Sequence, residues 1–211
     1  MNKPVIILGA GGHARVLIDM LRLRSVEIIG VTDADPAKKG TLIAGLPMLG
    51  TDQVIANYQP EEVRLVNGLG SVGLPTLRRQ IFTDFKRKGY SFLNVIHPSA
   101  VLAADIALEE GVQVMAGAVV QPGCRIGANT ILNTGAIVDH DCRIGAHVHV
   151  APGVTLSGGV RVGDAVHIGT GAIIIQGIDI GHNSLIAAGA VVVKNVSANV
   201  KVAGMPAREV Q

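Results

Sequence analysis

Residues 125–162 read RIGANTILNTGAIVDHDCRIGAHVHVAPGVTLSGGVRV, and every sixth residue of this stretch, beginning with Ile126, is aliphatic. This spacing fits neither an α-helix, whose apolar residues recur about every 3.6 positions, nor a single amphipathic strand, whose period is 2. It predicts a solenoid of short strands in which each hexad forms one flat side and three hexads form an 18-residue triangular coil. The period runs unbroken through Ile96, Leu102, Leu108, Val114, Val120, Ile126, Leu132, Val138, Ile144, Val150, Leu156, Val162, Ile168, Ile174, Ile180, Ile186 and Val192.

Other features recur at the length of one coil. Gly127, Gly145 and Gly163 are 18 residues apart, and Gly181 continues the series. We expect these glycines at corners that need the backbone freedom of glycine. Cys124 and Cys142 are also one coil apart, and we expect free thiols in the core, because a reducing compartment disfavours a disulfide. Aromatic residues make up only 2% of the chain and hydrophobic residues 48%, which predicts a core of stacked aliphatic side chains.

The composition also limits the function. The 211 residues are enough for two modest domains, and a net charge of +2 gives no reason to expect nucleic acid or an anionic membrane as partner. Small molecules are the expected partners. No window approaches 18 charge-free apolar residues, and residues 1–8 lack the basic region and long apolar stretch of a signal peptide. We therefore expect a cytoplasmic protein that does not enter the membrane.

Residues 1–92 follow a different pattern, in which strands alternate with helices. Residues 4–8 are a continuous apolar run, residues 9–13 are a glycine-rich turn, and residues 14–23 form a predicted helix with one apolar face. The residues of that face are Val16, Leu17, Met20 and Leu21. Further strands are predicted at 27–32 and 63–66, and a basic helix at about 74–88. The pattern predicts a small parallel sheet whose ligand crevice lies at the carboxyl ends of its strands.

The glycine-rich turn is close to a dinucleotide-binding fingerprint. Ala14 replaces the third glycine, and Asp33 lies near the usual distance for the acidic ligand of the ribose. A domain of this size holds about half of a dinucleotide site, so a single nucleotide is the favoured ligand. The alternative is a tight turn that binds nothing, which the Gly, Asp and Asn residues at three successive strand ends argue against.

Four of the seven histidines, His140, His147, His149 and His167, fall within two coils of the predicted solenoid. His140 lies between two carboxylates, Asp139 and Asp141, and should point outward because Val138 is the inward residue of its hexad. A carboxylate bonded to one ring nitrogen fixes the tautomer and raises the basicity of the other nitrogen, which suits a general base. The alternative is a solvated loop histidine.

His149 and His167 are 18 residues apart, so their side chains should stack on successive coils. Such a pair can bind a metal ion, but neither a His-x4-His pair nor a convincing third ligand accompanies it. We expect no metal. Stacked polar side chains beside a cofactor groove are the preferred interpretation.

The chain resembles the left-handed β-helix (hexapeptide-repeat) acyltransferases, specifically the two-domain sugar acetyltransferases of bacterial glycan pathways. The resemblance rests on residues 7–13 (ILGAGGH), 96–100 (IHPSA), 133–134 (NT), 139–141 (DHD) and 204–208 (GMPAR). It implies an α/β N-terminal domain with a small Rossmann-like parallel sheet over residues 1–92, which binds a nucleotide sugar. An all-β left-handed parallel β-helix would follow over residues 93–211, with a short C-terminal tail.

The same resemblance implies an activity. The protein would be a homotrimeric, acetyl-CoA-dependent N-acetyltransferase of a nucleotide-linked 4-amino-4,6-dideoxy sugar, of the bacillosamine and perosamine type and related to sialic acid O-acetyltransferases. His140 would be the base and Asp141 its orienting partner, although the family often has Glu at both flanking positions, so Asp139 or a water molecule could take that role. Transfer would be direct, since a thioester is already activated and the thiols are predicted to point inward.

The resemblance also assigns binding residues. His149, Gly158, Thr170 and Ala188 match acetyl-CoA positions, and the last three contribute backbone, so side-chain substitutions there should say little about function. The predicted substrate-binding residues are Gly11, Gly12, His13, Asp33, Asp35, Gly70 and Asn133. UDP is the first expectation for the nucleotide and GDP the second. Two alternatives stay open, namely O-acetylation of a sugar hydroxyl and a non-catalytic nucleotide-binding trimer.

Overall fold

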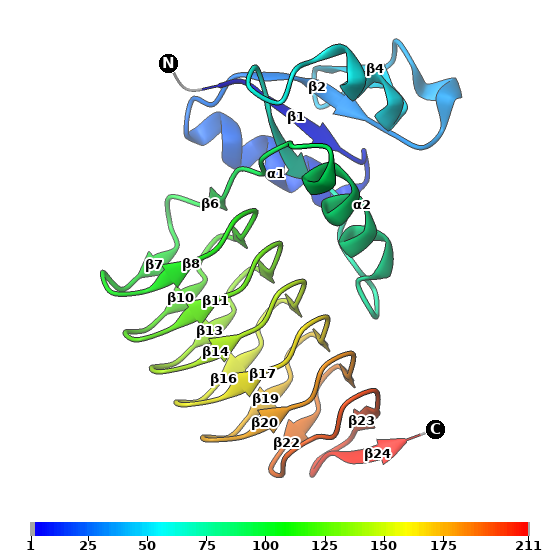
Figure 1. Ribbon diagram of the computed structural model, residues 1–211. Coiled ribbons are helices and arrows are strands. Elements are labelled where there is room, and N and C mark those ends of the chain that lie inside the picture. The colour runs from blue at the N-terminus through cyan, green and yellow to red at the C-terminus, as the bar shows by residue number, and fades with distance from the viewer. Residues whose placement is uncertain (1–2, 211) are drawn as a thin grey trace.

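In the computed structural model, which describes residues 3–210, a small α/β domain sits on one end of a triangular β-helix (Figure 1). The α/β domain has a five-stranded sheet in the order β3-β4-β2-β1-β5, in which β1 is parallel to both β2 and β5. Its elements are β1 (Val5–Leu8), α1 (Gly12–Leu23), β2 (Ile28–Thr32), β3 (Leu42–Ile43), β4 (Leu46–Gly50), β5 (Arg64–Asn67) and α2 (Thr76–Arg87), with short 3-10 helices at Pro36–Lys38 and Asp52–Asn57.

The predicted elements of this domain are confirmed, and two strands are added to them. The hairpin of β3 and β4 was not predicted, because its strands are short and Pro47 interrupts the apolar run. Ala44 and Gly45, which join the two strands, both have positive φ, 46° and 77°, as a two-residue hairpin turn requires. One residue of the predicted apolar helix face, Val16, is 46% exposed, whereas Ala14, Leu17, Ile18, Met20 and Leu21 are buried.

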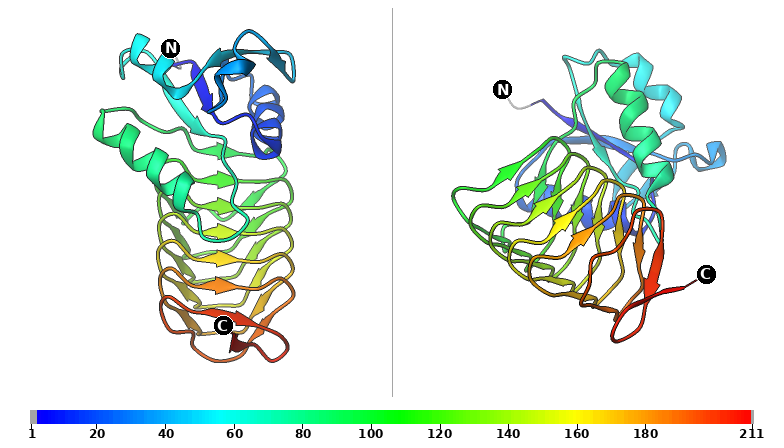
Figure 2. Two further views of the ribbon diagram at one scale, coloured as in Figure 1. Left: turned by 90° about the vertical axis from the view of Figure 1, so that its right-hand side faces the viewer. Right: turned by 60° about the horizontal axis from the view of Figure 1, so that its bottom comes forward.

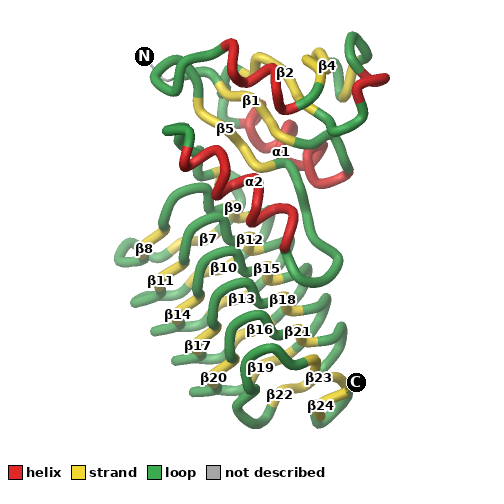
Figure 3. Tube along the Cα trace, turned by 45° about the vertical axis from the view of Figure 1, so that its right-hand side comes forward, coloured by secondary structure: helices red, strands yellow, loops and turns green. Residues whose placement is uncertain are grey.

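The β-helix has three faces, each a sheet of two-residue parallel strands stacked along the axis, and one face ends in a longer antiparallel pair (Figure 2 and Figure 3). We call the first the apolar face, and its strands are β7 (Val101–Leu102), β10 (Val119–Val120), β13 (Ile137–Val138), β16 (Thr155–Leu156), β19 (Ile173–Ile174) and β22 (Val191–Val192). The second is the arginine face, with β8 (Ala107–Leu108), β11 (Arg125–Ile126), β14 (Arg143–Ile144), β17 (Arg161–Val162) and β20 (Asp179–Ile180).

The third face carries the α/β domain at one end and is called the domain face. Its strands are β6 (Val95–Ile96), β9 (Gln113–Val114), β12 (Ile131–Leu132), β15 (His149–Val150), β18 (His167–Ile168), β21 (Leu185–Ile186), β23 (Lys201–Ala203) and β24 (Arg208–Val210). The antiparallel pair of β23 and β24 closes the C-terminal end (Figure 1). No helix within residues 3–210 is long and apolar enough to cross a membrane.

Strand pairing confirms the predicted 18-residue coil. Val120 pairs with Val138, and Val138 pairs with Leu156, one coil further along. From Val114 onward the large aliphatic residues of the hexads are buried in one continuous core, and those of the first hexads are partly buried against it. Cys124 and Cys142 are free and fully buried in that core, as predicted.

The reason given for the repeated corner glycines needs correction. Gly127 does not have a positive φ; instead, a Cβ there would lie 2.5 Å from the backbone nitrogen of Ala146 in the next coil. These glycines therefore allow close approach between coils. Left-handed backbone occurs at another position of the hexad, also every six residues, at Gly111, Gly117, Gly123, Asn129, Gly135, Asp141, His147, Gly153, Gly159, Ala165, Gly171, Gly177, Asn183 and Gly189.

Candidate functional site

His140 lies in the turn between β13 and β14, at the edge where the apolar face meets the arginine face. The Oδ2 atom of Asp141 lies 2.9 Å from the His140 Nδ1 atom, and Oδ1 of Asp139 accepts a hydrogen bond of 2.7 Å from the His140 backbone nitrogen. The two carboxylates therefore have different roles, since Asp141 orients the ring and Asp139 holds the backbone of the turn. The side chains of His140 and Asp141 are 63% and 74% exposed.

The electrostatics of this turn favour a basic imidazole. The pKa of His140 is raised above its ordinary value, first by the hydrogen bond that its ring donates to Asp141 and then by the charge of Asp139. With Nδ1–H donating to the carboxylate, Nε2 is left as the free acceptor of a proton. This is the arrangement of a general base with an orienting acid.

Gly158, one coil beyond His140, forms the surface against which the imidazole lies. A Cβ at Gly158 would be 2.5 Å from both Cε1 and Nε2 of His140. The expectation that a side-chain substitution here would say little about function is therefore corrected. Any side chain at Gly158 must displace the His140 ring.

A column of outward side chains on the domain face carries the second histidine group. His149 is buried, with Nδ1 2.7 Å from the Ser71 hydroxyl oxygen and Nε2 3.1 Å from the Asn133 amide nitrogen. Because the Asn133 amide nitrogen can only donate, the His149 Nε2 atom accepts and Nδ1 carries the proton. Burial lowers the pKa of His149 to about 3, so this ring is neutral at physiological pH. His167 stacks edge-on against it with ring centroids 5.0 Å apart, as the spacing predicted.

The loop that brings Ser71 to His149 is held by a buried arginine that the sequence analysis did not single out. The Nη1 atom of Arg78 donates to the carbonyls of Asn67 and Leu69, at 2.8 and 2.7 Å, and Nε donates to the carbonyl of Asn129 in the β-helix. The side chain is fully buried, and burial lowers its pKa to about 9. No carboxylate pairs with it, and its Nη2 atom has no hydrogen-bond partner among residues 3–210.

His13 belongs to the same junction between the domains. Its Nε2 atom lies 2.7 Å from Oε1 of Gln113, whose amide nitrogen donates to the Asn67 carbonyl. Burial and the charge of Arg78 lower the pKa of His13 to about 4, so the ring is neutral and Nε2–H donates to Gln113. The Nε2 side of the imidazole is thus engaged with the β-helix.

The predicted nucleotide residues lie at the carboxyl edge of the small sheet. Gly11 and Gly12 open α1, directly after β1, and Gly70 follows the adjacent strand β5. All three glycines are exposed, and a Cβ at Gly11 or Gly12 would meet nothing within 4 Å. A helix N-terminus with free amide groups and open space in front of it suits a phosphate group.

Asp33 follows β2, the neighbour of β1 on its other side. Its carboxylate accepts from the Asp35 backbone nitrogen at 3.0 Å and pairs with Lys38 Nζ at 2.9 Å. These two contacts, with the Asp35 amide first, lower the pKa of Asp33, and the Ala10 amide of the glycine turn contributes too. Asp35 caps the following 3-10 helix through Ala37. The structure thus brings Asp33 beside the glycine turn, while the Asp35 side chain serves a local turn.

Thr170 and Ala188 lie on a different edge from His140, where the domain face meets the apolar face. Both are exposed, and they are joined through the Gly189 amide, which donates to the Thr170 carbonyl. Asn133 lies on the same edge. A single chain therefore carries the predicted site residues on two separate edges of the prism. Within residues 3–210 no cluster of three or more His, Cys, Asp or Glu side chains is arranged to hold a metal ion.

Arg78, Gln113 and Ser71 were missed because their roles depend on contacts between domains. Arg78 is one of several basic residues in its helix, and nothing in the sequence distinguishes it from the others. Gln113 occupies an outward position of its hexad, which in several other hexads is exposed to solvent. The Asn-Gly-Leu-Gly-Ser sequence at 67–71 was the one available signal, since it marks a strand end rich in polar and flexible residues.

Comparison with known proteins agrees with this architecture. The PglD N-terminal domain family matches residues 4–85, the bacterial transferase hexapeptide (six repeats) matches 123–158, and the hexapeptide repeat of succinyl-transferase matches 159–194. A comparison with curated proteins gave no match.

Among solved structures, a histidine-to-asparagine mutant of perosamine N-acetyltransferase from Caulobacter crescentus, in complex with CoA and GDP-perosamine, is 37% identical with a TM-score of 0.92. The match covers 100% of this chain and 98% of that one. The acetyltransferase domain of PglB from Neisseria gonorrhoeae, in complex with acetyl coenzyme A, is 33% identical with a TM-score of 0.91, and the match covers 100% of both chains. WeeI from Acinetobacter baumannii, 24% identical with a TM-score of 0.82 and matched over 99% of this chain and 100% of its own, shares the fold.

Proposed function

The chain belongs to the hexapeptide-repeat sugar N-acetyltransferases with a PglD-type N-terminal domain, and we propose that it acetylates the 4-amino group of a nucleotide-linked 4-amino-4,6-dideoxy sugar from acetyl-CoA. The observation that carries the proposal is the exposed pair of His140 and Asp141 lying over Gly158. The sequence alone favoured UDP as the nucleotide. GDP now takes precedence, because the Caulobacter structures of 37–38% identity hold GDP-perosamine.

In the proposed reaction the sugar amine attacks the thioester carbonyl while Nε2 of His140 takes a proton from the amine. The new C–N bond forms, the C–S bond of the thioester breaks, and the proton on Nε2 passes to the departing CoA thiolate. Asp141 holds Nδ1–H throughout, which keeps the tautomer fixed and stabilises the imidazolium that forms. The enzyme's task is positioning and proton transfer, because the thioester is already activated.

Buried thiols support direct transfer rather than an acyl-enzyme. Burial raises the pKa of Cys142 to about 12 and also raises the pKa of Cys124. Both sulfur atoms donate to backbone carbonyls inside the β-helix, Cys124 to Asp139 and Cys142 to Ser157. Neither group is therefore a thiolate at neutral pH, and neither faces an opening for the substrate.

The protein is proposed to act as a homotrimer built on the apolar face. Its outward residues include Val101, Ile137 and Ile173, which are 62%, 41% and 44% exposed, an unusual row of aliphatic side chains for a free surface. If three copies turn this face toward a common axis, the His140 edge of one copy meets the Asn133 edge of the next. The trimer would thus unite the two sets of site residues that a single chain keeps apart.

Acetyl-CoA turnover tests the proposal. Purified protein and acetyl-CoA are mixed with a GDP-linked 4-amino-4,6-dideoxyhexose in one reaction and with the UDP-linked sugar in another. Release of free CoA thiol is followed with time, and the mass of the product is determined by mass spectrometry. We expect a mass gain of one acetyl group on the GDP sugar. Acetylation found only on a sugar hydroxyl group would show that the enzyme is an O-acetyltransferase. A trimer that binds no acetyl-CoA would support the non-catalytic alternative.

The homotrimer is checked separately by sedimentation of the wild type and of Ile137→Asp with Ile173→Asp. We expect the wild type to sediment as a trimer and the double variant as a monomer, because the new charges would have to be buried in the apolar interface. A monomeric wild type would contradict the assembly.

A further inference from the structure

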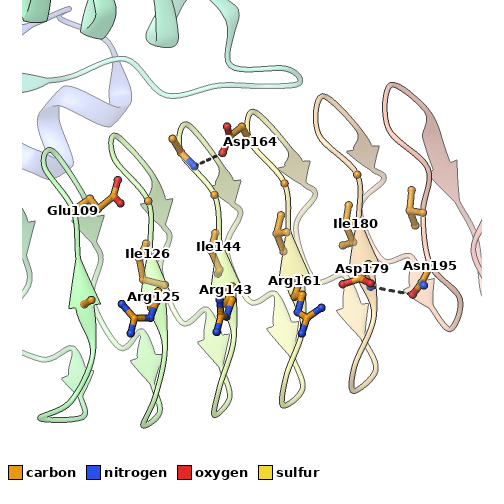
Figure 4. Close-up of a pocket in the computed structure, with 18 of the residues that line it drawn as sticks. Glu109, Arg125, Ile126, Arg143, Ile144, Arg161, Asp164, Asp179, Ile180 and Asn195 are labelled. Carbon is orange, nitrogen blue, oxygen red and sulfur yellow. Dashed lines mark hydrogen bonds between the residues drawn. The ribbon is translucent and has the colours of Figure 1, made fainter.

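Three arginines form a column on the arginine face. Arg125 on β11 pairs in register with Arg143 on β14, and Arg143 pairs with Arg161 on β17. Neighbouring strands lie about 4.8 Å apart, so consecutive guanidinium groups are close neighbours. Figure 4 shows the three side chains in one row along the same side of their strands. We call this row the arginine ladder.

The arginine ladder places like charges directly beside one another, which destabilises a sheet. All three side chains are exposed, and within residues 3–210 none of them forms an ion pair or a hydrogen bond to another side chain. Asp179 continues the column after Arg161. Arg161 therefore has one oppositely charged neighbour in the column, whereas Arg125 and Arg143 have none. No ion pair within residues 3–210 offsets the repulsion among the three arginines, as expected of groups kept for a ligand.

The arginine ladder lines a groove of about 740 Å³, a volume in the range of small-molecule sites. Three carboxylates also line it. Asp179 stands at the end of the arginine row, beside Arg161. Glu109 and Asp164 lie at the opposite edge, where each accepts a hydrogen bond from a backbone amide, of Ala128 and Ala146 respectively. In Figure 4 they stand on the other side of the strands from the arginines. The groove therefore has a cationic edge and an anionic edge, and an anion can approach the guanidinium groups without meeting Glu109 or Asp164.

The cationic edge is also the edge of His140. Each arginine is the first residue of its strand, directly after the turn from the apolar face, and Arg143 is three residues beyond His140. A ligand bound along the arginine ladder therefore extends beside the turn that carries the proposed base. In the proposed trimer this edge borders the groove between two copies.

We propose that Arg125, Arg143 and Arg161 form a binding site for the diphosphate group of a substrate that reaches His140. The proposal rests on the proposed function, which supplies two candidates with this chemistry, CoA and the nucleotide sugar. Guanidinium groups one strand apart can each form paired hydrogen bonds to successive phosphates, and arginine is the side chain best suited to that contact. A diphosphate carries enough negative charge to neutralise two adjacent arginines.

Binding measurements on the purified protein, in the assembly that it forms in solution, test the site. Arg143→Gln and Arg125→Gln are compared with the wild type by calorimetry, using CoA, dephospho-CoA, GDP and UDP as probes at low and high salt. We expect each variant to raise the Kd of either the CoA pair or the nucleoside diphosphates by about tenfold at low salt, with a smaller difference at high salt. A loss for CoA and dephospho-CoA alike assigns the site to the CoA diphosphate, and a loss for GDP or UDP assigns it to the nucleotide sugar.

The matched control is Arg87→Gln, which removes an exposed arginine at the end of α2, and it should bind every probe as the wild type does. Thermal unfolding without ligand checks the fold, and the ladder variants should unfold no earlier than the wild type, because they remove repulsion. Arginine variants that bind all probes normally, or lose affinity for CoA but not for dephospho-CoA, would overturn the diphosphate site. A wild type that binds none of the probes would overturn the proposed function as well.

Discussion

At the scale of single residues, the two carboxylates beside His140 have different tasks although they are chemically identical. Asp141 has a positive φ of 59°, and this backbone turns its carboxylate toward the imidazole. The Asp139 carboxylate instead accepts a hydrogen bond from the backbone amide of His140. The sequence predicted an orienting acid and left its identity open, because flanking aspartates differ only in backbone conformation.

His140→Ala should lower kcat at least about a hundredfold, because it removes the proposed proton acceptor. Cys142→Ala, the matched control, should keep most of the activity, since the thiol is buried in the core and protonated. Steady-state kinetics with CoA-thiol detection measures both variants. Equal losses in the two variants would contradict direct transfer.

The pH profile should report the contact between His140 and Asp141. The base must be neutral, so kcat/KM falls as the pH drops through the pKa of His140, which Asp141 raises. Asp141→Asn removes the largest cause of that increase, so the acid limb should move to lower pH and kcat should fall. Asn tolerates the left-handed backbone at this position, which preserves the turn.

Asp139→Asn is the comparison variant for this profile, and it should move the limb less, because the charge of Asp139 is the second contribution. Titration of the substrate amine is common to all three enzymes and cancels in the difference. If the acid limb of Asp141→Asn stays at the wild-type pH, Asp141 does not orient the His140 ring.

At the scale of elements, the β-helix distinguishes two requirements for glycine. Gly127 has ordinary backbone but no room, with a Cβ 2.5 Å from the next coil, whereas Gly117 has a φ of 67° and open space within 4 Å. Gly127→Ala should therefore cost more stability, about 3 kcal/mol, because it pushes two coils apart. Gly117→Ala should cost about 1 kcal/mol, the strain of left-handed backbone in an alanine.

Urea unfolding measures both glycine variants, and Gly117→Asn should recover part of the loss because Asn adopts left-handed backbone readily. An equal cost at the two positions would show that spacing between coils is not the constraint at Gly127.

Elements differ in how far the sequence predicts them. The β-helix is predictable because each hexad repeats one requirement, a large aliphatic residue such as Val138 pointing inward, and the signal accumulates over many coils. The hairpin of β3 and β4 offers only one short turn at Ala44 and Gly45, too little to distinguish it from a loop. The repeated glycines such as Gly127 were located correctly but explained wrongly, since spacing along the chain does not reveal the distance between coils.

At the scale of the whole molecule, the junction of the two domains is a buried polar network centred on Arg78. Its members come from the strand-end loop at 67–71, from α1 and α2, and from the first coils of the β-helix, and they converge only once both domains are folded. Sequence reasoning could assign Gly70 and His149 to separate ligands, but their connection through Ser71 depends on the docking of one domain on the other. The proposed nucleotide loop and the domain face are therefore mechanically linked.

This network should make the protein sensitive to acid. His13 and His149 have pKa values lowered to about 4 and about 3, against 6.5 in the unfolded chain, because they are buried and close to Arg78. Their contribution to stability is complete above pH 6.5, and it declines as the pH falls from 6.5 through the folded-state values, since the unfolded chain then binds more protons. His140, whose pKa is raised, acts in the opposite direction, but it is exposed and contributes little.

The melting temperature should therefore drop steadily between pH 6.5 and pH 4.5, as followed by circular dichroism in buffers of equal ionic strength. His149→Gln removes one of the protonated sites while its amide can still bond to Ser71 or Asn133, so this variant should be less stable at pH 7.5 and should show a shallower slope. His182→Gln, which removes an exposed histidine of the β-helix, should keep the wild-type slope. A melting temperature that is constant over this range would mean that the junction opens to water before the histidines are protonated, and the buried network would then not couple the two domains.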